Sequence, residues 1–255
     1  MIAVKDLSCS FSFSGSVFSR DKFTAVSPLT VSFEDGGRYA IVGESGSGKT
    51  TLARMIAGLQ RPSSGNVFVE GKSVYGRHKA GKEHFKQVQL IQQNSFSALD
   101  PKMTVGKSIE EPLICFFRLD KTERRKRCEK LMSLCNLPVA YYARVPSELS
   151  GGEQKRVAIA RALAVEPECL IFDEATNGFD LPLRKKIVGE IVDLQDQIGF
   201  TLIFITHDME LAVVVADEIL VMRDSRLVER TRFSGDTAVF TNEYSRVLLE
   251  SGGIV

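Results

Sequence analysis

The stretch Gly43–Thr50 reads Gly-Glu-Ser-Gly-Ser-Gly-Lys-Thr and constrains this chain more than any other feature. It follows an apolar run at 39–43 and precedes an amphipathic run at 49–59. The pattern G-x-x-x-x-G-K-[ST] in this setting is typical of a loop that wraps phosphates with backbone N–H groups. Gly46 and Gly48 fit the points where the backbone must approach the phosphates closely. The sequence therefore predicts a phosphate site at the N-terminus of a helix.

Within this loop, each residue type has an expected task. We expect Lys49 to reach the β- and γ-phosphates and Thr50 to ligate Mg²⁺. The residues expected to line the site are Gly43, Glu44, Ser45, Gly46, Ser47, Gly48, Lys49, Thr50 and Thr51.

A second anchor is the run 169–174, in which a continuous apolar segment ends in two acids. Carboxylates at the end of a buried strand are costly unless they meet a metal ion or serve in proton transfer. We expect Asp173 to hold Mg²⁺ through water and Glu174 to polarise the water that attacks the γ-phosphate.

The order of apolar and amphipathic runs predicts an α/β fold with a P-loop core. Unbroken apolar runs favour parallel strands covered on both faces by helices. They lie at 39–43, 66–71, 88–93, 169–174, 201–208 and 218–224, with helical patterns at 49–59, 184–198 and 208–217. We expect one domain over 1–255, with antiparallel β structure at 1–38, a RecA-like core at 39–102 and 165–230, helices at 103–164 and a tail at 231–255.

Composition excludes several classes of protein. The 33 basic and 32 acidic residues leave a net charge of +1, so we expect no nucleic-acid surface. The five cysteines do not form C-x-x-C pairs, which indicates reduced, mostly buried thiols in a cytosolic protein. No apolar run approaches the roughly 18–20 residues of a membrane span, so a membrane role would act through partner chains.

The run 149–153, Leu-Ser-Gly-Gly-Glu, opens a helical pattern between the phosphate loop and the acidic strand. Here the chain resembles the ABC ATPases along essentially its whole length, and this run resembles their signature. In that family two ATPase domains close head to tail over two ATP molecules. The resemblance implies that Ser150, Gly151 and Gly152 contact the γ-phosphate held by the opposite subunit. Glu153 stands where the family more commonly has Gln.

Further residues match family elements one by one. Gln93, with Gln92 next to it, resembles the glutamine that senses Mg²⁺ and the attacking water. His207 resembles the histidine that contacts the γ-phosphate. Asp180 matches the D-loop aspartate, although the three residues before it, 177–179, differ from the usual Ser-Ala-Leu.

The aromatic platform for adenine lies near the N-terminus in this family. Phe11 matches it by distance from the first strand, and Phe13 is the alternative.

The stretch 94–113 and the tail 242–251 resemble the dipeptide, oligopeptide and nickel importer ATPases, with Ser95 in place of a proline. The resemblance implies an ATP-hydrolysing subunit at the cytoplasmic face of the membrane that powers import of peptides or nickel chelates. It implies transmembrane partner subunits, with a coupling helix docking near 94–113, and a second ATPase subunit, either a paralogue or another copy. An exporter ATPase, a soluble ABC ATPase without a transport role and a weakly active regulatory subunit are the alternatives. Since the tail carries no cysteine cluster, we expect no iron–sulfur centre.

Overall fold

The computed structural model describes residues 1–16, 19–76, 81–92, 99–232 and 240–251. The chain divides into two compact units, one formed by Met1–Phe85 with Thr201–Val255 and the other by Lys86–Phe200. Among the described helices, none is long and apolar enough to cross a membrane. The subdomain boundaries expected from the sequence stay a prediction.

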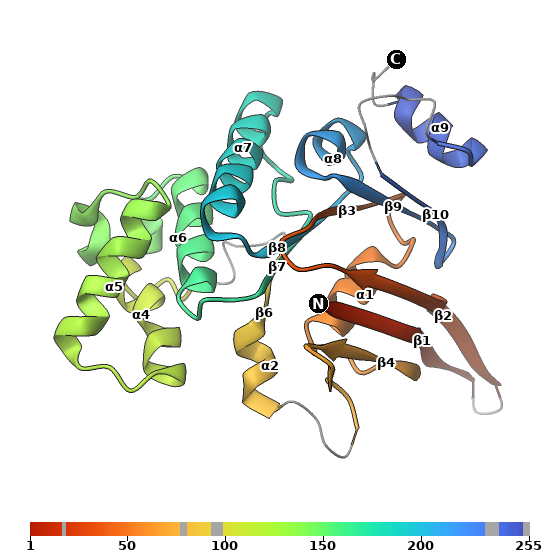
Figure 1. The fold of residues 1–255 in the computed structure, drawn as a ribbon, viewed down its shortest axis with the longest axis horizontal. Coiled ribbons are helices and arrows are strands. Elements are labelled where there is room, and N and C mark those ends of the chain that lie inside the picture. Colours follow the sequence, from red (N-terminus) through yellow and green to blue (C-terminus); the bar gives the residue numbers. More distant parts are fainter. Residues whose placement is uncertain (17–18, 77–80, 93–98, 233–239, 252–255) are drawn as a thin grey trace. The chain divides into compact units, whose positions relative to one another are not determined.

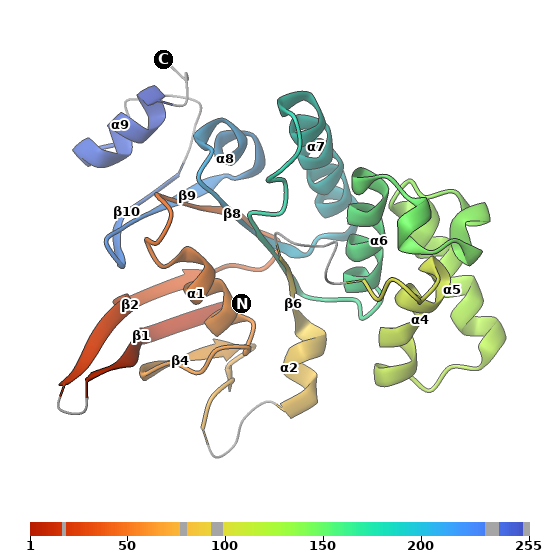
Figure 2. The same ribbon diagram turned by 180° about the vertical axis from the view of Figure 1, so that it is seen from behind.

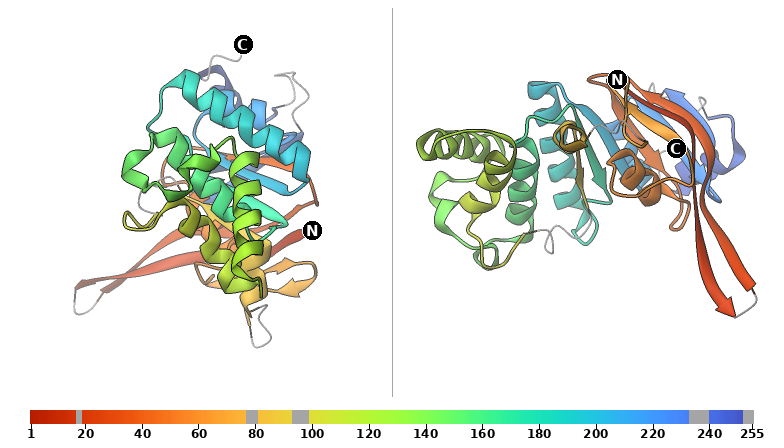
Figure 3. Two further views of the ribbon diagram at one scale, coloured as in Figure 1. Left: turned by 90° about the vertical axis from the view of Figure 1, so that its left-hand side faces the viewer. Right: turned by 90° about the horizontal axis from the view of Figure 1, so that it is seen from below.

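The first unit contains a four-stranded antiparallel sheet. Its strands are β1 (Ile2–Ser16), β2 (Ser19–Phe33), β4 (Ser64–Val69) and β5 (Lys72–Ser73), in the order β2-β1-β4-β5. The distal parts of β1 and β2 extend as a two-stranded arm (Figure 3). The sequence predicts antiparallel structure at the N-terminus, which the sheet confirms.

One strand lies in a different sheet from the one expected. The apolar run at 66–71 predicts a strand of the parallel core, but β4 pairs antiparallel with β1, with Val4 opposite Val67. Val4 and Val67 are both 0% exposed and Val69 is 1% exposed. Because these valines alternate along their strands, they share one buried face, which fixes β4 in the antiparallel sheet.

The same unit contains a parallel group of strands. β3 (Arg38–Val42) pairs in parallel with β8 (Thr201–Thr206) on one side and with β9 (Glu218–Arg223) on the other. β10 (Arg226–Arg232) adds antiparallel to β9. Asp224 and Ser225 connect these two strands with φ of 47° and 65°, as a two-residue hairpin turn requires. The sequence did not indicate β10.

The described helices that accompany these strands are α1 (Lys49–Ile56), α8 (Met209–Val215) and α9 (Glu243–Ser251). The unit boundary falls within a further helix, α2 (Gly81–Gln87). α8 packs against β3 and β8, and α9 lies beside α8 (Figures 1 and 2). The predicted phosphate loop connects the end of β3 to the start of α1, so it has the expected strand-to-helix setting.

The second unit combines a parallel strand pair with a group of helices. β6 (Val88–Ile91) pairs with β7 (Cys169–Asp173), and every residue of β7 is buried. The helices are α4 (Val105–Phe116), α5 (Lys121–Leu134), α6 (Gly151–Leu163) and α7 (Leu181–Ile198), with short 3₁₀ turns η1 (Val139–Ala143) and η2 (Pro146–Glu148). α4, α5 and α6 pack on one another (Figure 1), which agrees with the helices predicted at 103–164.

A lysine lies inside this helical core. Lys155 on α6 is only 1% exposed, and its Nζ donates a hydrogen bond to the carbonyl oxygen of Gln92 at 3.4 Å. Burial lowers the pKa of Lys155 to about 7, because removing an ammonium from water disfavours its charged form.

This burial predicts a pH-dependent stability. Below about pH 7 the lysine is protonated in both the folded and the unfolded chain, so folding carries the full cost of burying the charge. As the pH rises further, the folded chain loses the proton first and the cost shrinks. We expect Lys155→Met to raise the free energy of unfolding by roughly 1–4 kcal/mol at about pH 6 and by less at about pH 9. Urea unfolding at both pH values measures this, and an equal difference at the two would contradict it.

Candidate functional site

The phosphate loop begins where β3 ends, and two of its glycines pack tightly against neighbouring backbone. Gly43 has φ of 146°, and a Cβ there would lie 2.0 Å from the carbonyl oxygen of Met222. Gly48 has φ of 102°, and a Cβ there would lie 2.2 Å from the carbonyl oxygen of Ala25. A Cβ at Gly46, in contrast, would meet nothing within 4 Å. The loop is therefore fixed at its two ends, and Gly46 between them is open to an approaching group.

Lys49 is folded into its own loop. Its side chain is 4% exposed, and Nζ donates hydrogen bonds to the carbonyl oxygens of Gly43 and Glu44, both at 2.7 Å. The hydroxyl oxygen of Ser47 lies 3.3 Å from the same nitrogen and accepts a third. A buried ammonium needs such partners. The loop thus already encloses a positive charge where the sequence predicts phosphate.

The N-terminus of α1 differs from that of the helices in the second unit. Gly48 caps it without a side chain, and its first turn contains no acidic residue. Ser150 caps α6 and Asp180 caps α7, each with a side-chain oxygen. The positive end of the α1 dipole is therefore left to attract an anion.

His207 lies next to this loop by the register of the sheet. Val42 at the end of β3 is paired with Thr206 at the end of β8. Gly43 and His207 are the next residues of these two adjacent parallel strands, and His207 is exposed. The structure therefore brings His207 and the start of the loop to the same edge of the first unit.

In the second unit, the two predicted acids follow each other at the end of β7. Asp173 is 5% exposed, whereas Glu174 is half-buried and has a left-handed backbone with φ of 49°. The Asn177 side-chain nitrogen donates a hydrogen bond to Oε2 of Glu174 at 2.9 Å. In the sequence, Asn177 stands out only because it differs from the residue that the family usually has at this position. Its position three residues after Glu174, in a tight turn, is the signal that could have indicated the contact.

Asp180 has a structural contact of its own. Its Oδ1 accepts a hydrogen bond from the backbone N–H of Leu183 at 2.9 Å, so it caps α7. Its role as a D-loop residue stays a prediction.

The predicted signature also departs from expectation in one respect. The sequence suggested bare N–H groups at the start of α6, but the Ser150 N–H and hydroxyl both donate to Oε2 of Glu153, at 2.7 and 2.8 Å. These bonds hold the pKa of the Glu153 carboxyl below its ordinary value, the backbone N–H contributing most. Gly151 and Gly152 begin the helix as expected. The Glu153 carboxylate therefore lies at the N-terminus of α6, bonded to the cap residue Ser150.

Of the predicted adenine-stacking residues and the predicted glutamine, the structure describes only Phe11 with its side chain. Phe11 is half-buried on β1, opposite Phe23, which is 51% exposed on β2. Gln93 lies outside the described residues, and so does the side chain of Phe13. The predicted Mg²⁺ ligands in the described part of the chain are the Thr50 hydroxyl in the first unit and the Asp173 carboxylate in the second. Both are hard oxygen donors, which suit Mg²⁺.

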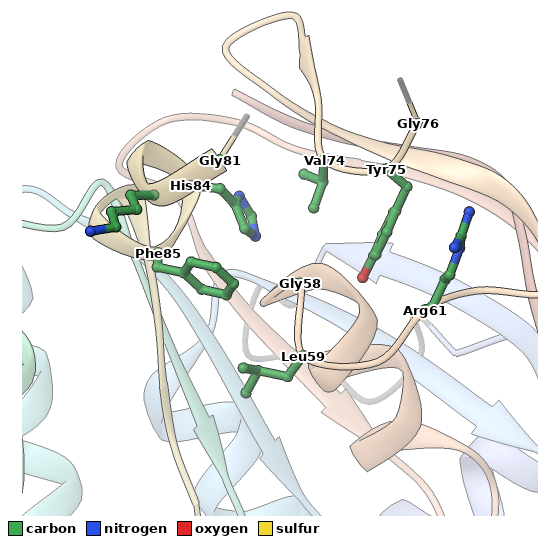
Figure 4. A pocket seen from close by; sticks show the side chains of 10 residues that line it. Gly58, Leu59, Arg61, Val74, Tyr75, Gly76, Gly81, His84 and Phe85 are labelled. Carbon is green, nitrogen blue, oxygen red and sulfur yellow. The ribbon is translucent and has the colours of Figure 1, made fainter. Parts of the chain in front are cut away.

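A separate cavity of about 570 Å³ lies in the first unit at the far end of α1 (Figure 4). His84 is 2% exposed there, and its ring covers Gly58, where a Cβ would lie 2.7 Å from the imidazole. Leu59 and Phe85 also line the cavity and are 55% and 42% exposed. None of the predicted site residues lines this cavity, so it is distinct from the phosphate loop.

Known proteins resemble this chain over most of its length. The family described as ABC transporter matches residues 26–177. A putative peptide import ATP-binding protein of Brucella abortus (strain 2308) is 39% identical over 89% of this chain and 69% of its own length. The nickel import ATP-binding protein NikE of Escherichia coli O6:K15:H31 (strain 536 / UPEC) is 34% identical over 97% of this chain and 92% of its own length.

Two solved structures share the fold. The ATP-binding cassette MJ0796, dimeric, in a post-hydrolysis state and bound to ADP and Pi, superposes with a TM-score of 0.78 at 27% identity, over 91% of this chain and 98% of that one. Part of the ABC transporter complex cbiONQ, cbiO1 from Clostridium perfringens, gives 0.77 at 26% identity, over 90% and 87%. This chain therefore belongs to the ABC transporter family and is one of its ATP-binding, ATP-hydrolysing cassettes.

Proposed function

We propose that this ATPase powers the import of peptides or nickel complexes through transmembrane partner subunits, from the cytoplasmic face of the membrane. The names of its relatives, a peptide importer subunit and a nickel importer subunit, support this class of cargo. The observation that carries the ATP-dependent step is the phosphate loop, with Lys49 enclosed by loop oxygens and α1 left without a side-chain cap.

Different predicted residues bind different parts of ATP. Lys49, already held by its loop carbonyls, reaches the β- and γ-phosphate oxygens through charge-assisted contacts. Phe11 stacks on adenine. Thr50, Gln93 and Asp173 would hold Mg²⁺, which would neutralise charge on the phosphates.

Hydrolysis is assigned to two further residues. Glu174 accepts a proton from the attacking water, and His207 stabilises charge that develops on the γ-phosphoryl group. Asn177 keeps Glu174 in one orientation through the hydrogen bond to Oε2. This local contact supports a working catalytic base despite the altered D-loop.

A second ATPase subunit completes each site in this proposal, either a paralogue or another copy. Ser150, Gly151 and Gly152 of this chain contact the γ-phosphate held by that subunit, and Asp180 lies at the junction between the two. Contacts that exist only in the closed pair drive closure, and a nearly complete reversal of such an equilibrium takes about 5.5 kcal/mol. Hydrolysis removes these contacts and lets the pair open.

The proposal predicts how ATP hydrolysis depends on protein concentration. We expect the rate of the purified chain to rise more steeply than linearly with its concentration if two copies pair. Glu174→Gln should lower the rate at least about 100-fold while ATP binding persists. A phosphate-release assay measures the rate. Tight ATP binding without hydrolysis would indicate an obligate paralogous partner, and hydrolysis that survives in Glu174→Gln would contradict the assigned base.

A second prediction concerns the carboxylate at the start of α6. Glu153 carries a negative charge to the place where the γ-phosphate of the opposite subunit is proposed to bind, so Glu153→Gln should strengthen ATP-dependent pairing. An interaction of about 0.3–1 kcal/mol corresponds to a roughly 2- to 5-fold lower dissociation constant. Sedimentation velocity with ATP on the Glu174→Gln background measures it.

Glu123→Gln is the matched control, because Glu123 makes the same capping contact with Asp120 at the start of α5. It should leave pairing unchanged. Weaker pairing in Glu153→Gln would show that the carboxylate supports the signature rather than opposing the phosphate.

A further inference from the structure

The C-terminal helix reaches the phosphate loop. The hydroxyl oxygen of Tyr244 on α9 accepts a hydrogen bond from the backbone N–H of Glu44 at 3.3 Å. The backbone carbonyl oxygen of Glu44 accepts a hydrogen bond from Lys49 Nζ, and so does the carbonyl oxygen of Gly43. The first peptide groups of the loop are thus held from two sides, by Lys49 inside the loop and by Tyr244 outside it.

Tyr244 is itself fixed by its neighbours. The guanidinium of Arg223 lies 4.6 Å from the centre of its ring, a cation–π contact. Arg223 ends β9 directly after Met222, whose carbonyl oxygen is the atom that packs against Gly43. The backbone N–H of Tyr244 donates to Oδ1 of Asn242 at 3.0 Å. Its hydroxyl is therefore presented to the loop from a defined position.

The start of α9 is tied to β10. Oε1 of Glu229 accepts hydrogen bonds from the Thr241 N–H at 2.7 Å, from the Thr241 hydroxyl at 2.9 Å and from the Asn242 N–H at 3.3 Å. Phe240 just before the helix is 0% exposed, and Leu249 near its end is 2% exposed. These contacts dock α9 as a packed element of the first unit (Figure 2).

We propose that Tyr244 is a positioning residue for nucleotide binding. By accepting the Glu44 N–H, it fixes the Gly43–Glu44 peptide group with the Gly43 carbonyl turned towards Lys49, and so holds the start of the loop in the shape that receives phosphates. Without this acceptor, the Gly43–Glu44 peptide can rotate, and binding must then order it. The inference rests on the proposed function, because it concerns the same nucleotide.

Tyr244→Phe tests this by removing one hydroxyl and keeping the ring on Arg223. We expect the dissociation constants for Mg-ATP and Mg-ADP each to rise about 3- to 10-fold, the range that the loss of one hydrogen bond gives. KM for ATP should rise by the same factor, while kcat stays within about twofold, because Tyr244 touches the loop and not the reacting atoms. Titration calorimetry and steady-state kinetics give the two readouts.

Tyr39→Phe is the matched control. The Tyr39 hydroxyl also accepts a backbone N–H, that of Glu34 at 2.7 Å, but it lies near the start of β3, whereas the loop follows the end of that strand. This variant should lower the melting temperature without changing nucleotide affinity. Hydrogen exchange of the Glu44 amide should become faster in Tyr244→Phe and stay the same in Tyr39→Phe.

The outcomes separate this inference from the proposal on which it rests. Unchanged nucleotide affinity in Tyr244→Phe would overturn the positioning role and leave the proposed function intact. An equal loss of affinity in both variants would also overturn it, because a general loss of stability would then explain the effect. A wild-type chain that binds neither Mg-ATP nor Mg-ADP would overturn the proposed function itself.

Discussion

The ammonium of Lys49, enclosed by oxygens of its own loop, is the interaction on which the rest of this site depends. A cation with 4% exposure is tolerable only because Gly43, Glu44 and Ser47 supply acceptors. Those acceptors can face inward only because Gly43 and Gly48 fit against neighbouring strands where any Cβ would clash. Because Lys49 is already held in place by the loop, little of the binding energy of a phosphate goes into ordering it.

The N-termini of α1 and α6 differ in how readily they accept an anion. α1 starts with a bare glycine and no acid in its first turn, whereas α6 starts with Ser150 already bonded to the carboxylate of Glu153. Phosphate can therefore bind at α1 without displacing an acidic side chain. In the proposed pairing, phosphate at α6 competes with Glu153. We therefore propose that ATP binds the phosphate loop first and that the signature of the second subunit engages afterwards.

Short sequence patterns predicted the elements whose structure depends on interactions between residues close together in the chain. Unbroken apolar runs identified β7 and β8 because strands buried on both faces carry no alternation. The loop before α1 followed from its glycines and lysine. The capping contact of Glu153 was also readable, since Ser-x-x-Glu before a helix has a known meaning. The sheet to which β4 belongs was not, because it depends on which strand offers a matching buried face.

Contacts between distant segments could not be predicted from the sequence, because they too depend on how separate elements pack. Tyr244 and Glu44 are 200 residues apart and meet only because α9 docks beside the parallel strands. The Asn177 contact to Glu174 is short in sequence but depends on the left-handed backbone of Glu174, which no propensity predicts.

Calorimetric titration of the purified chain and of Lys49→Ala with Mg-ATP tests whether this loop holds the phosphates, with circular dichroism to establish that both chains are folded. We expect the wild type to bind and the variant to lose at least about 10-fold in affinity, because a charge-assisted hydrogen bond is removed. Equal affinity in a folded Lys49→Ala chain would contradict this expectation, because the phosphates would then be held somewhere other than this loop.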